Sequence, residues 1–263
     1  MVPIDLGSLY EALRTYDPLA TRQAVGRIAS ELDNLAPEQV HDLVEALSSL
    51  FYIDLGDKPE YVSVVEDTVA TIAAIGEPAI PKLMELMCES DIKANLMFAR
   101  TLGRIGPPAY GPLKDLFYRA QIPWHRVLAL FALAKMHEAA LMEILPDVVN
   151  SLDDSDRELR DTAIRTLGKI IDTFQPGQLP KDLVSHAFER LLLRLNDPSP
   201  VMRAKAARTI GKIAKKRYLD DEQKSSAIEA LQSFLNDRNG GPDPSYLVRR
   251  EAEEALAHFK LYG

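Results

Sequence analysis

Apolar residues recur along this chain three and four positions apart, which is the spacing that places them on one face of an α-helix. The pattern is clearest in residues 156–172 and 199–217, where apolar residues are interleaved with charged and polar ones. No stretch alternates apolar and polar residues for long enough to predict a β-strand. The spacing therefore predicts an all-α chain of about fifteen helices.

A tetrapeptide recurs within these helices, with an apolar residue first, a small residue second and an apolar residue fourth. Strict copies start at Val25, Leu102, Leu167 and Ile210, and looser copies start at Ile72, Leu133 and Leu256. Successive copies lie 30 to 47 residues apart, a period that is typical of stacked helical hairpins. The first and fourth positions share one side of the helix, so they predict its buried face.

Glycine occupies the second position of the four strict copies. These glycines are Gly26, Gly103, Gly168 and Gly211. A glycine in a helix interior costs about 1 kcal/mol relative to alanine, so its return at one repeat position needs a physical reason. We predict that the backbone of a neighbouring helix comes close at this position.

Each hairpin is predicted to consist of a motif helix, which carries the tetrapeptide, and a partner helix. Motif helices are predicted near residues 18–33, 60–75, 91–105, 122–136, 156–172, 199–217 and 245–260. Partner helices are predicted near residues 5–16, 36–52, 78–89, 108–120, 139–152, 180–195 and 221–236. Several partner helices open with prolines, which suit the first helical turn. The glycine- and proline-rich loop at 239–244 is predicted to be non-helical and exposed.

A longer pattern, Asp-x-x-x-x-[Val/Leu/Met]-Arg-x-x-Ala-x-x-x-Leu-Gly-x-Ile, fits residues 154–170 and 197–213 best and 244–260 more loosely. In this pattern the chain resembles the HEAT-repeat family, especially the short repeats of phycobilisome bilin lyases. The resemblance implies a bacterial protein with one domain over residues 1–263. The implied fold is a right-handed superhelical α-solenoid of about seven HEAT-like hairpins, with the motif helices on its concave face.

The same resemblance implies a structural ladder. In HEAT-like repeats the arginine of the pattern pairs with an aspartate of the same or a neighbouring repeat. The residues expected in this ladder are Arg126, Asp154, Arg160, Asp197, Arg203 and Arg249.

Composition and charge narrow the class of protein. The chain has 263 residues and a net charge of −8, with 46% hydrophobic and 27% charged residues, as in an ordinary folded protein. It has no basic segment followed by an apolar one at its start, no apolar run of about 18 residues, and a single cysteine, Cys88. We therefore expect a cytoplasmic protein without a membrane span or an internal disulfide.

Basic residues gather on the predicted exposed side of the motif helices, although the chain is acidic overall. The net charge is −10 over residues 1–100 and +8 over residues 157–217. We call these basic residues the basic stripe. Together with the apolar residues beside it, the stripe predicts a concave surface that binds an acidic protein. An ordinary solvent-exposed helix face explains the same residues equally well. The predicted surface consists of Arg27, Arg100, Arg104, Trp124, Leu128, Phe131, Lys135, Arg165, Lys169, Lys205, Arg208 and Lys212.

The chain shows no constellation of catalytic or metal-ligating residues. His137 and Glu138 form a single His-Glu pair, whereas HEAT-like hydroxylases that hold two irons need several. No metal or cofactor is therefore expected, and a non-enzymatic interaction scaffold or adaptor of undetermined oligomeric state is the favoured function. One alternative is a bilin lyase subunit or chromophore chaperone with a bilin as its ligand. The other is nucleic-acid binding, which the net charge of −8 disfavours.

Overall fold

The structure, a computed structural model, describes residues 6–236 and 241–262, and the side chains of these residues up to 259. Within these ranges the chain forms fourteen α-helices and six short 3₁₀-helices and contains no strand, so the all-α prediction is confirmed. No helix of this part of the chain is long and apolar enough to cross a lipid bilayer.

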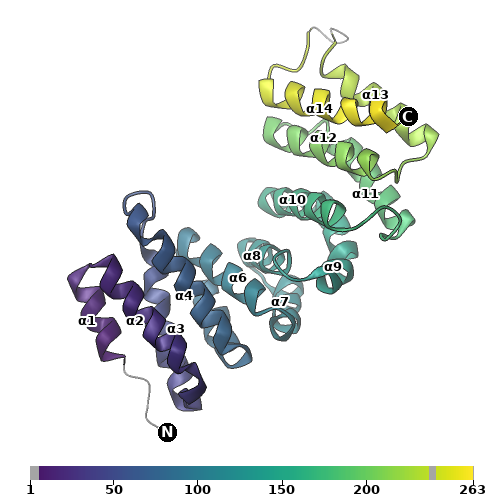
Figure 1. Ribbon diagram of the computed structural model, residues 1–263. Helices are drawn as coiled ribbons and strands as arrows, with labels where there is room; N and C mark the ends of the chain where they lie inside the picture. The colour runs from purple at the N-terminus through teal and green to yellow at the C-terminus, as the bar shows by residue number, and fades with distance from the viewer. Residues whose placement is uncertain (1–5, 237–240, 263) are drawn as a thin grey trace. The chain divides into compact units, whose positions relative to one another are not determined.

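The chain divides into two compact units, Met1–His137 and Glu138–Gly263. The helices of the first unit, purple to teal in Figure 1, are α1 (Gly7–Thr15), α2 (Pro18–Glu31), α3 (Val40–Ser48), α4 (Val62–Ile75), α5 (Ile80–Glu89), α6 (Ile92–Ile105), α7 (Pro107–Arg119) and α8 (Pro123–Leu133). The second unit contains α9 (Glu138–Asn150), α10 (Arg157–Thr173), α11 (Lys181–Arg194), α12 (Pro200–Lys215), α13 (Asp221–Ser233) and α14 (Tyr246–Tyr262).

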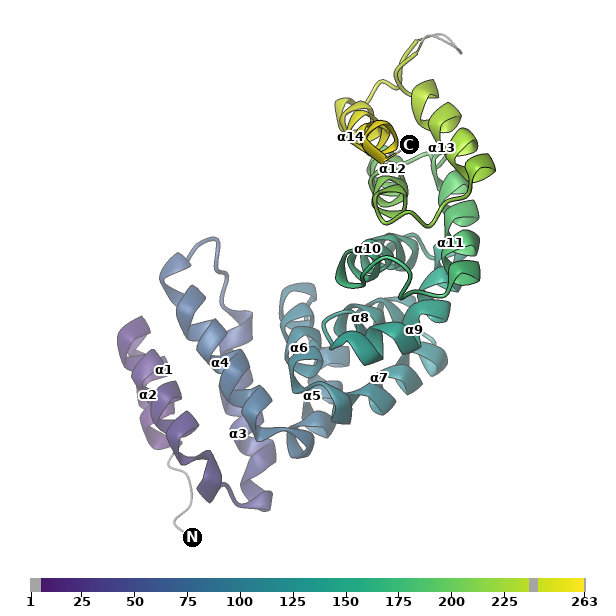
Figure 2. The same ribbon diagram turned by 45° about the vertical axis from the view of Figure 1, so that its right-hand side comes forward.

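Each unit consists of two layers of helices. In the first unit the motif helices α2, α4, α6 and α8 pack one against the next, and the partner helices α1, α3, α5 and α7 pack against them. In the second unit α10, α12 and α14 form the motif layer and α9, α11 and α13 the partner layer, as Figure 2 shows. This is the packing of an all-α solenoid, in which each element contacts its neighbours in the chain.

The predicted helices lie close to the observed ones, although 3₁₀-helices replace some of the predicted helix ends. The partner helix expected at 36–52 is split, because 3₁₀-helices at Pro37–Gln39 and Ser49–Tyr52 flank α3. In the loop expected at 239–244, residues 239 and 240 lie outside the described residues. Pro242 and Pro244 are exposed, as predicted, but the side chain of Asp243 is only 7% exposed.

The first and fourth positions of the tetrapeptide form the core of each unit. Burial of each such side chain contributes roughly 1.5–3 kcal/mol to folding. The side chains that are at most 2% exposed include Val25, Ile28, Leu102, Leu167, Ile170, Ile210 and Ile213. Ile105, at the last position of α6, is half-buried because the helix ends there.

The glycine position brings motif helices into close contact at two of its four strict copies. A Cβ on Gly211 would lie 2.8 Å from both Cα and Cβ of Ala255 in α14, and one on Gly103 would lie 2.6 Å from the carbonyl oxygen of Ala132 in α8. At Gly168 the nearest atoms are side-chain ends at 3.4 Å, and at Gly26 nothing lies within 4 Å. The predicted close approach is confirmed for the first two and is wrong for Gly26.

These distances predict opposite effects of one substitution. Gly211→Ala forces the backbone of α14 away and should lower the free energy of unfolding by about 1–3 kcal/mol. Gly26→Ala meets no neighbour and should raise it by up to about 1 kcal/mol through helix propensity. Urea unfolding followed by circular dichroism measures both, and equal effects of the two variants would contradict the packing explanation.

Candidate protein-interaction surface

Helix α12 and the two residues after it form a strongly basic segment of the second unit. Residues 201–217 contain seven basic residues and no acidic one. Two of these lysines bind carboxylates of α10: Lys205 pairs with Asp161, and Lys212 Nζ lies 2.5 Å from Asp172 Oδ2. Asp161 also forms an ion pair with Arg165 of its own helix, at 2.7 Å. These predicted surface cations are therefore bound to the neighbouring helix or to their own.

The other side of α12 binds a buried carboxylate of α14. Arg208 Nε donates to Glu251 Oε2 at 2.7 Å, and Arg250 donates to the other carboxylate oxygen at 2.8 Å. Glu251 is 1% exposed, and burial alone would raise its pKa. The hydrogen bond from Arg208 outweighs this effect, so that the pKa of Glu251 is lowered and the residue stays ionised at neutral pH.

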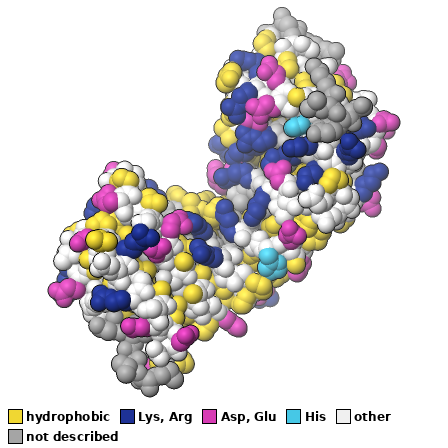
Figure 3. Space-filling view, in the orientation of Figure 1, with side chains coloured by type: hydrophobic (Ala, Val, Ile, Leu, Met, Phe, Trp, Pro, Cys, Tyr) yellow, Lys and Arg dark blue, Asp and Glu magenta, His cyan; other side chains and the backbone are white. Residues whose placement is uncertain are grey.

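The first unit uses the same kind of ion pair. Arg100 of α6 binds Glu66 of α4 through both guanidinium nitrogens at 2.5 Å, and this pair raises the pKa of Arg100. Arg22 of α2 binds Asp67 of α4 at 2.6 Å. In Figure 3, magenta carboxylates lie among the dark blue lysines and arginines on the visible face of each unit. Much of the predicted stripe therefore joins successive motif helices.

A smaller part of the predicted surface remains open on α6 and at the end of α8. Arg104 and Lys135 are exposed, and neither forms an ion pair with any described residue. Lys135 Nζ lies 4.8 Å from the ring centroid of Phe131, which is half-buried. A Cβ on Gly103, the residue before Arg104, would lie 2.6 Å from Lys135 Cβ, so the two cations flank one close helix contact. We call Arg104, Phe131 and Lys135 the α6–α8 patch.

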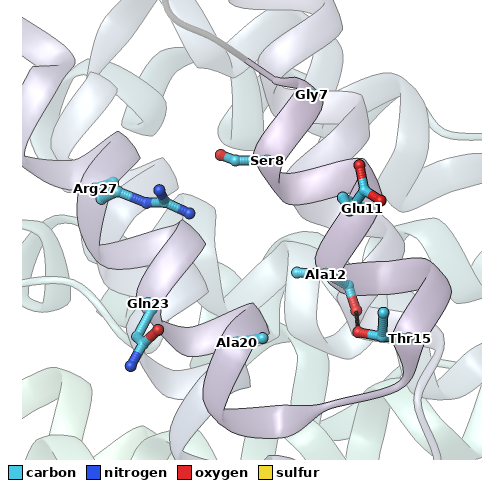
Figure 4. A pocket seen from close by; sticks show the side chains of 8 residues that line it. All are labelled: Gly7, Ser8, Glu11, Ala12, Thr15, Ala20, Gln23 and Arg27. Atoms are coloured by element: carbon cyan, nitrogen blue, oxygen red, sulfur yellow. Dashed lines mark hydrogen bonds between the residues drawn. The ribbon is translucent and has the colours of Figure 1, made fainter.

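The other predicted surface residues lie in different surroundings. Arg27 of α2 lines a pocket of about 480 Å³ between α1 and α2 and points toward Ser8 across it (Figure 4). Lys169 is exposed, and Trp124 is half-buried with its Nε1 atom buried and without a hydrogen-bond partner in the described chain. Leu128 is fully buried. Its prediction as a surface residue is wrong, because the close α6–α8 packing covers its position.

The ladder arginines of the second unit bind backbone oxygens. The guanidiniums of Arg160, Arg203 and Arg249 donate to the carbonyl oxygens of Asp154, Asp197 and Asp243, at 2.8, 2.9 and 2.5 Å. Each aspartate is six residues before its arginine, and its carboxylate accepts the backbone N–H two residues further on. Within each repeat, the arginine thus fixes the loop that begins the motif helix.

One ladder contact joins two repeats, and sequence reasoning missed its acidic partner. Arg203 donates through two nitrogens to the carboxylate of Asp243, at 2.9 and 3.1 Å. The signal in the sequence was a shared pattern, Asp-Pro-Ser with an arginine four residues after the serine, at 197–203 and 243–249. Arg126, by contrast, has its guanidinium 5.5 Å from the ring centroid of Phe117, and alanine stands six residues before it.

Comparison with known proteins shows the fold. No protein-family model and no curated protein sequence matches this chain. A designed armadillo repeat protein in complex with the peptide (KR)4 is similar, with 18% identity, a TM-score of 0.53, and coverage of 84% of this chain and 99% of that one. An engineered protein from the Northeast Structural Genomics Consortium has 20% identity, a TM-score of 0.52, and coverage of 99% and 98%. The chain therefore has a helical repeat fold.

Loss of the cation that holds Glu251 should cost more than loss of an exposed pair. Arg208→Ala leaves the buried carboxylate with Arg250 alone and should lower the free energy of unfolding by about 2 kcal/mol. Arg165→Ala removes a partner that is 58% exposed and should cost less than about 1 kcal/mol. Chemical unfolding compares the two variants, and similar losses would contradict the importance of burial.

The lowered pKa of Glu251 also predicts a pH dependence. A carboxyl whose pKa is lower in the folded chain contributes stability above its ordinary pKa and loses it as the pH falls through the folded value. Glu251→Gln should therefore flatten the fall in unfolding free energy between about pH 6 and about pH 3. Unfolding curves at several pH values test this, with Glu253→Gln, on an exposed position of the same helix, as the control that should change little.

Proposed function

We propose that the protein is a non-enzymatic interaction scaffold that binds an acidic protein segment on the exposed face of α6 and α8. The observation that supports this most is the α6–α8 patch, where Arg104 and Lys135 lack carboxylate partners among the described residues and flank an aromatic ring. A helical repeat fold offers such a face to an extended partner.

The patch combines the two features that a docking site for an acidic peptide needs. Unpaired surface cations accelerate the encounter with a carboxylate-rich chain and favour it over basic competitors. The ring of Phe131 offers an apolar contact, and aromatic residues are enriched among the side chains that dominate binding energy. The cations that already bind carboxylates, such as Lys212, would have to break an existing pair first.

The designed armadillo protein, whose structure is a complex with the peptide (KR)4, supports peptide binding by a fold of this kind. That peptide is basic, whereas the exposed charges of the α6–α8 patch favour an acidic one. The two peptide classes therefore provide a direct comparison in one assay.

Charge reversal at the patch tests the proposal. A labelled peptide of alternating glutamate and aspartate with one central phenylalanine should bind the full chain, as measured by fluorescence anisotropy. The variant Arg104→Glu/Lys135→Glu should bind it about tenfold more weakly at low salt, with a smaller difference at high salt. The control Arg14→Glu/Lys181→Glu makes the same change in net charge at exposed positions elsewhere and should bind like the wild type.

Equal binding by the two double variants, or preferential binding of a (KR)4 peptide at this patch, would refute the acidic-partner proposal. The same variants address the alternative ligands, because a bilin has propionate groups and single-stranded DNA has phosphates that these cations would also meet. A bilin whose absorbance spectrum changes on addition of wild-type protein, but not of Arg104→Glu/Lys135→Glu, would favour the chromophore chaperone instead.

A further inference from the structure

The partner layer of the first unit contains a groove between α1 and α3 that the proposed function does not use. Its volume is about 780 Å³. Leu6, Tyr10 and Leu13 line it from α1 and the residue that precedes it, and Asp42 and Glu45 line it from α3. The groove therefore has one apolar wall and one acidic wall.

The apolar wall is exposed because α1 packs on α2 with its other side. Leu9 and Ala12 are the buried residues of α1, and they lie on the side that packs against the rest of the unit. Tyr10 remains 46% exposed, and Leu13 is half-buried. Further along the same layer, α3 packs against α5. The α1–α3 groove thus lies where two successive partner helices leave room for another element.

The acidic wall keeps an excess of negative charge. Lys82 of α5 is the nearby cation, and its Nζ lies 2.8 Å from Glu85 and 3.1 Å from Glu45. The hydrogen bond to Glu85 raises the pKa of Lys82, so its one positive charge is fixed and shared between two carboxylates. Asp42 is 76% exposed at its side chain, and its cationic partner among the described residues is His41, at 3.4 Å and charged only when protonated. The wall therefore has unmatched carboxylate charge facing solvent.

We propose that this groove receives a cationic amphipathic helix of a partner protein. The apolar side of that helix would pack on Tyr10 and Leu13, and its lysines or arginines would face Asp42 and Glu45. Helix α1 has nine residues and is about 13 Å long, so two to three turns of the guest helix fit along it. Anchors at positions i, i+3 or i+4, and i+7 match this length.

This surface is independent of the α6–α8 patch and has the opposite charge preference. A protein with both would bind an acidic segment on its motif layer and a basic helix on its partner layer. It would then act as an adaptor between two partners of opposite charge.

A model peptide tests the groove without knowledge of the natural partner. The probe is a labelled 14-residue peptide of leucine and lysine with helical amphipathic spacing, and the reference is a scrambled peptide of the same composition. The full chain should bind the amphipathic peptide at least about fivefold more tightly than the scrambled one in fluorescence anisotropy.

Variants then locate the binding. Asp42→Lys and Tyr10→Ala should each weaken binding of the amphipathic peptide about fivefold, because one reverses the charge of the acidic wall and the other removes an apolar anchor. The control Glu89→Lys makes the same charge change at an exposed position on α5 outside the groove and should stay within about twofold of the wild type. Circular dichroism should show unchanged helicity in all three variants.

Three outcomes would overturn the proposal. They are equal binding of amphipathic and scrambled peptides, equal weakening by Asp42→Lys and Glu89→Lys, and unchanged binding by Tyr10→Ala. The variant Arg104→Glu/Lys135→Glu should retain wild-type binding of the cationic peptide. Its behaviour separates failure of the groove from failure of the acidic-peptide patch.

Discussion

The side-by-side contact between successive motif helices is the interaction on which this protein depends. A helical repeat has no closed core, so each hairpin is stabilised mainly by its neighbours. At Gly211 and Gly103 the absence of a side chain lets two helix backbones meet, and apolar residues in the first and fourth positions of the tetrapeptide fill the interior beside them. At Gly26 the equivalent space is empty, so the contact varies along the chain.

Charge complements this packing. A motif helix exposes lysines and arginines, and a neighbouring motif helix, either the one before or the one after, places carboxylates beside them, as with Arg208 and Glu251 or Arg100 and Glu66. Isolated exposed pairs of this kind add little stability, but the burial of Glu251 makes its arginines necessary. Many of the charges that look like a docking surface in the sequence thus join neighbouring motif helices, whereas Arg104 and Lys135 have no carboxylate partner among the described residues.

The sequence predicted the bounds of the helices more closely than the exposure of residues beside the buried face, for a physical reason. Helical periodicity identifies which side of a helix is buried, and a repeated tetrapeptide fixes where each hairpin begins, so the helix bounds were predictable. Exposure at the edge of that buried side depends on how closely the next helix approaches. Leu128, Lys205 and Glu251 share one repeat position, yet the first and last are buried and Lys205 is half-buried. The sequence of one helix alone does not determine how closely its neighbour packs.

The one-sided charge of α12 has a consequence for how the chain is ordered. All its ionic side chains are cationic, and its carboxylate partners come from α10 on one side and from α14 and the loop before it on the other. Were the hairpin of α11 and α12 copied in tandem, like charges would face each other at that joint. The hairpins of this protein are therefore not interchangeable, because each has charges that match its own two neighbours. This limits how such a protein can gain or lose repeats by gene duplication.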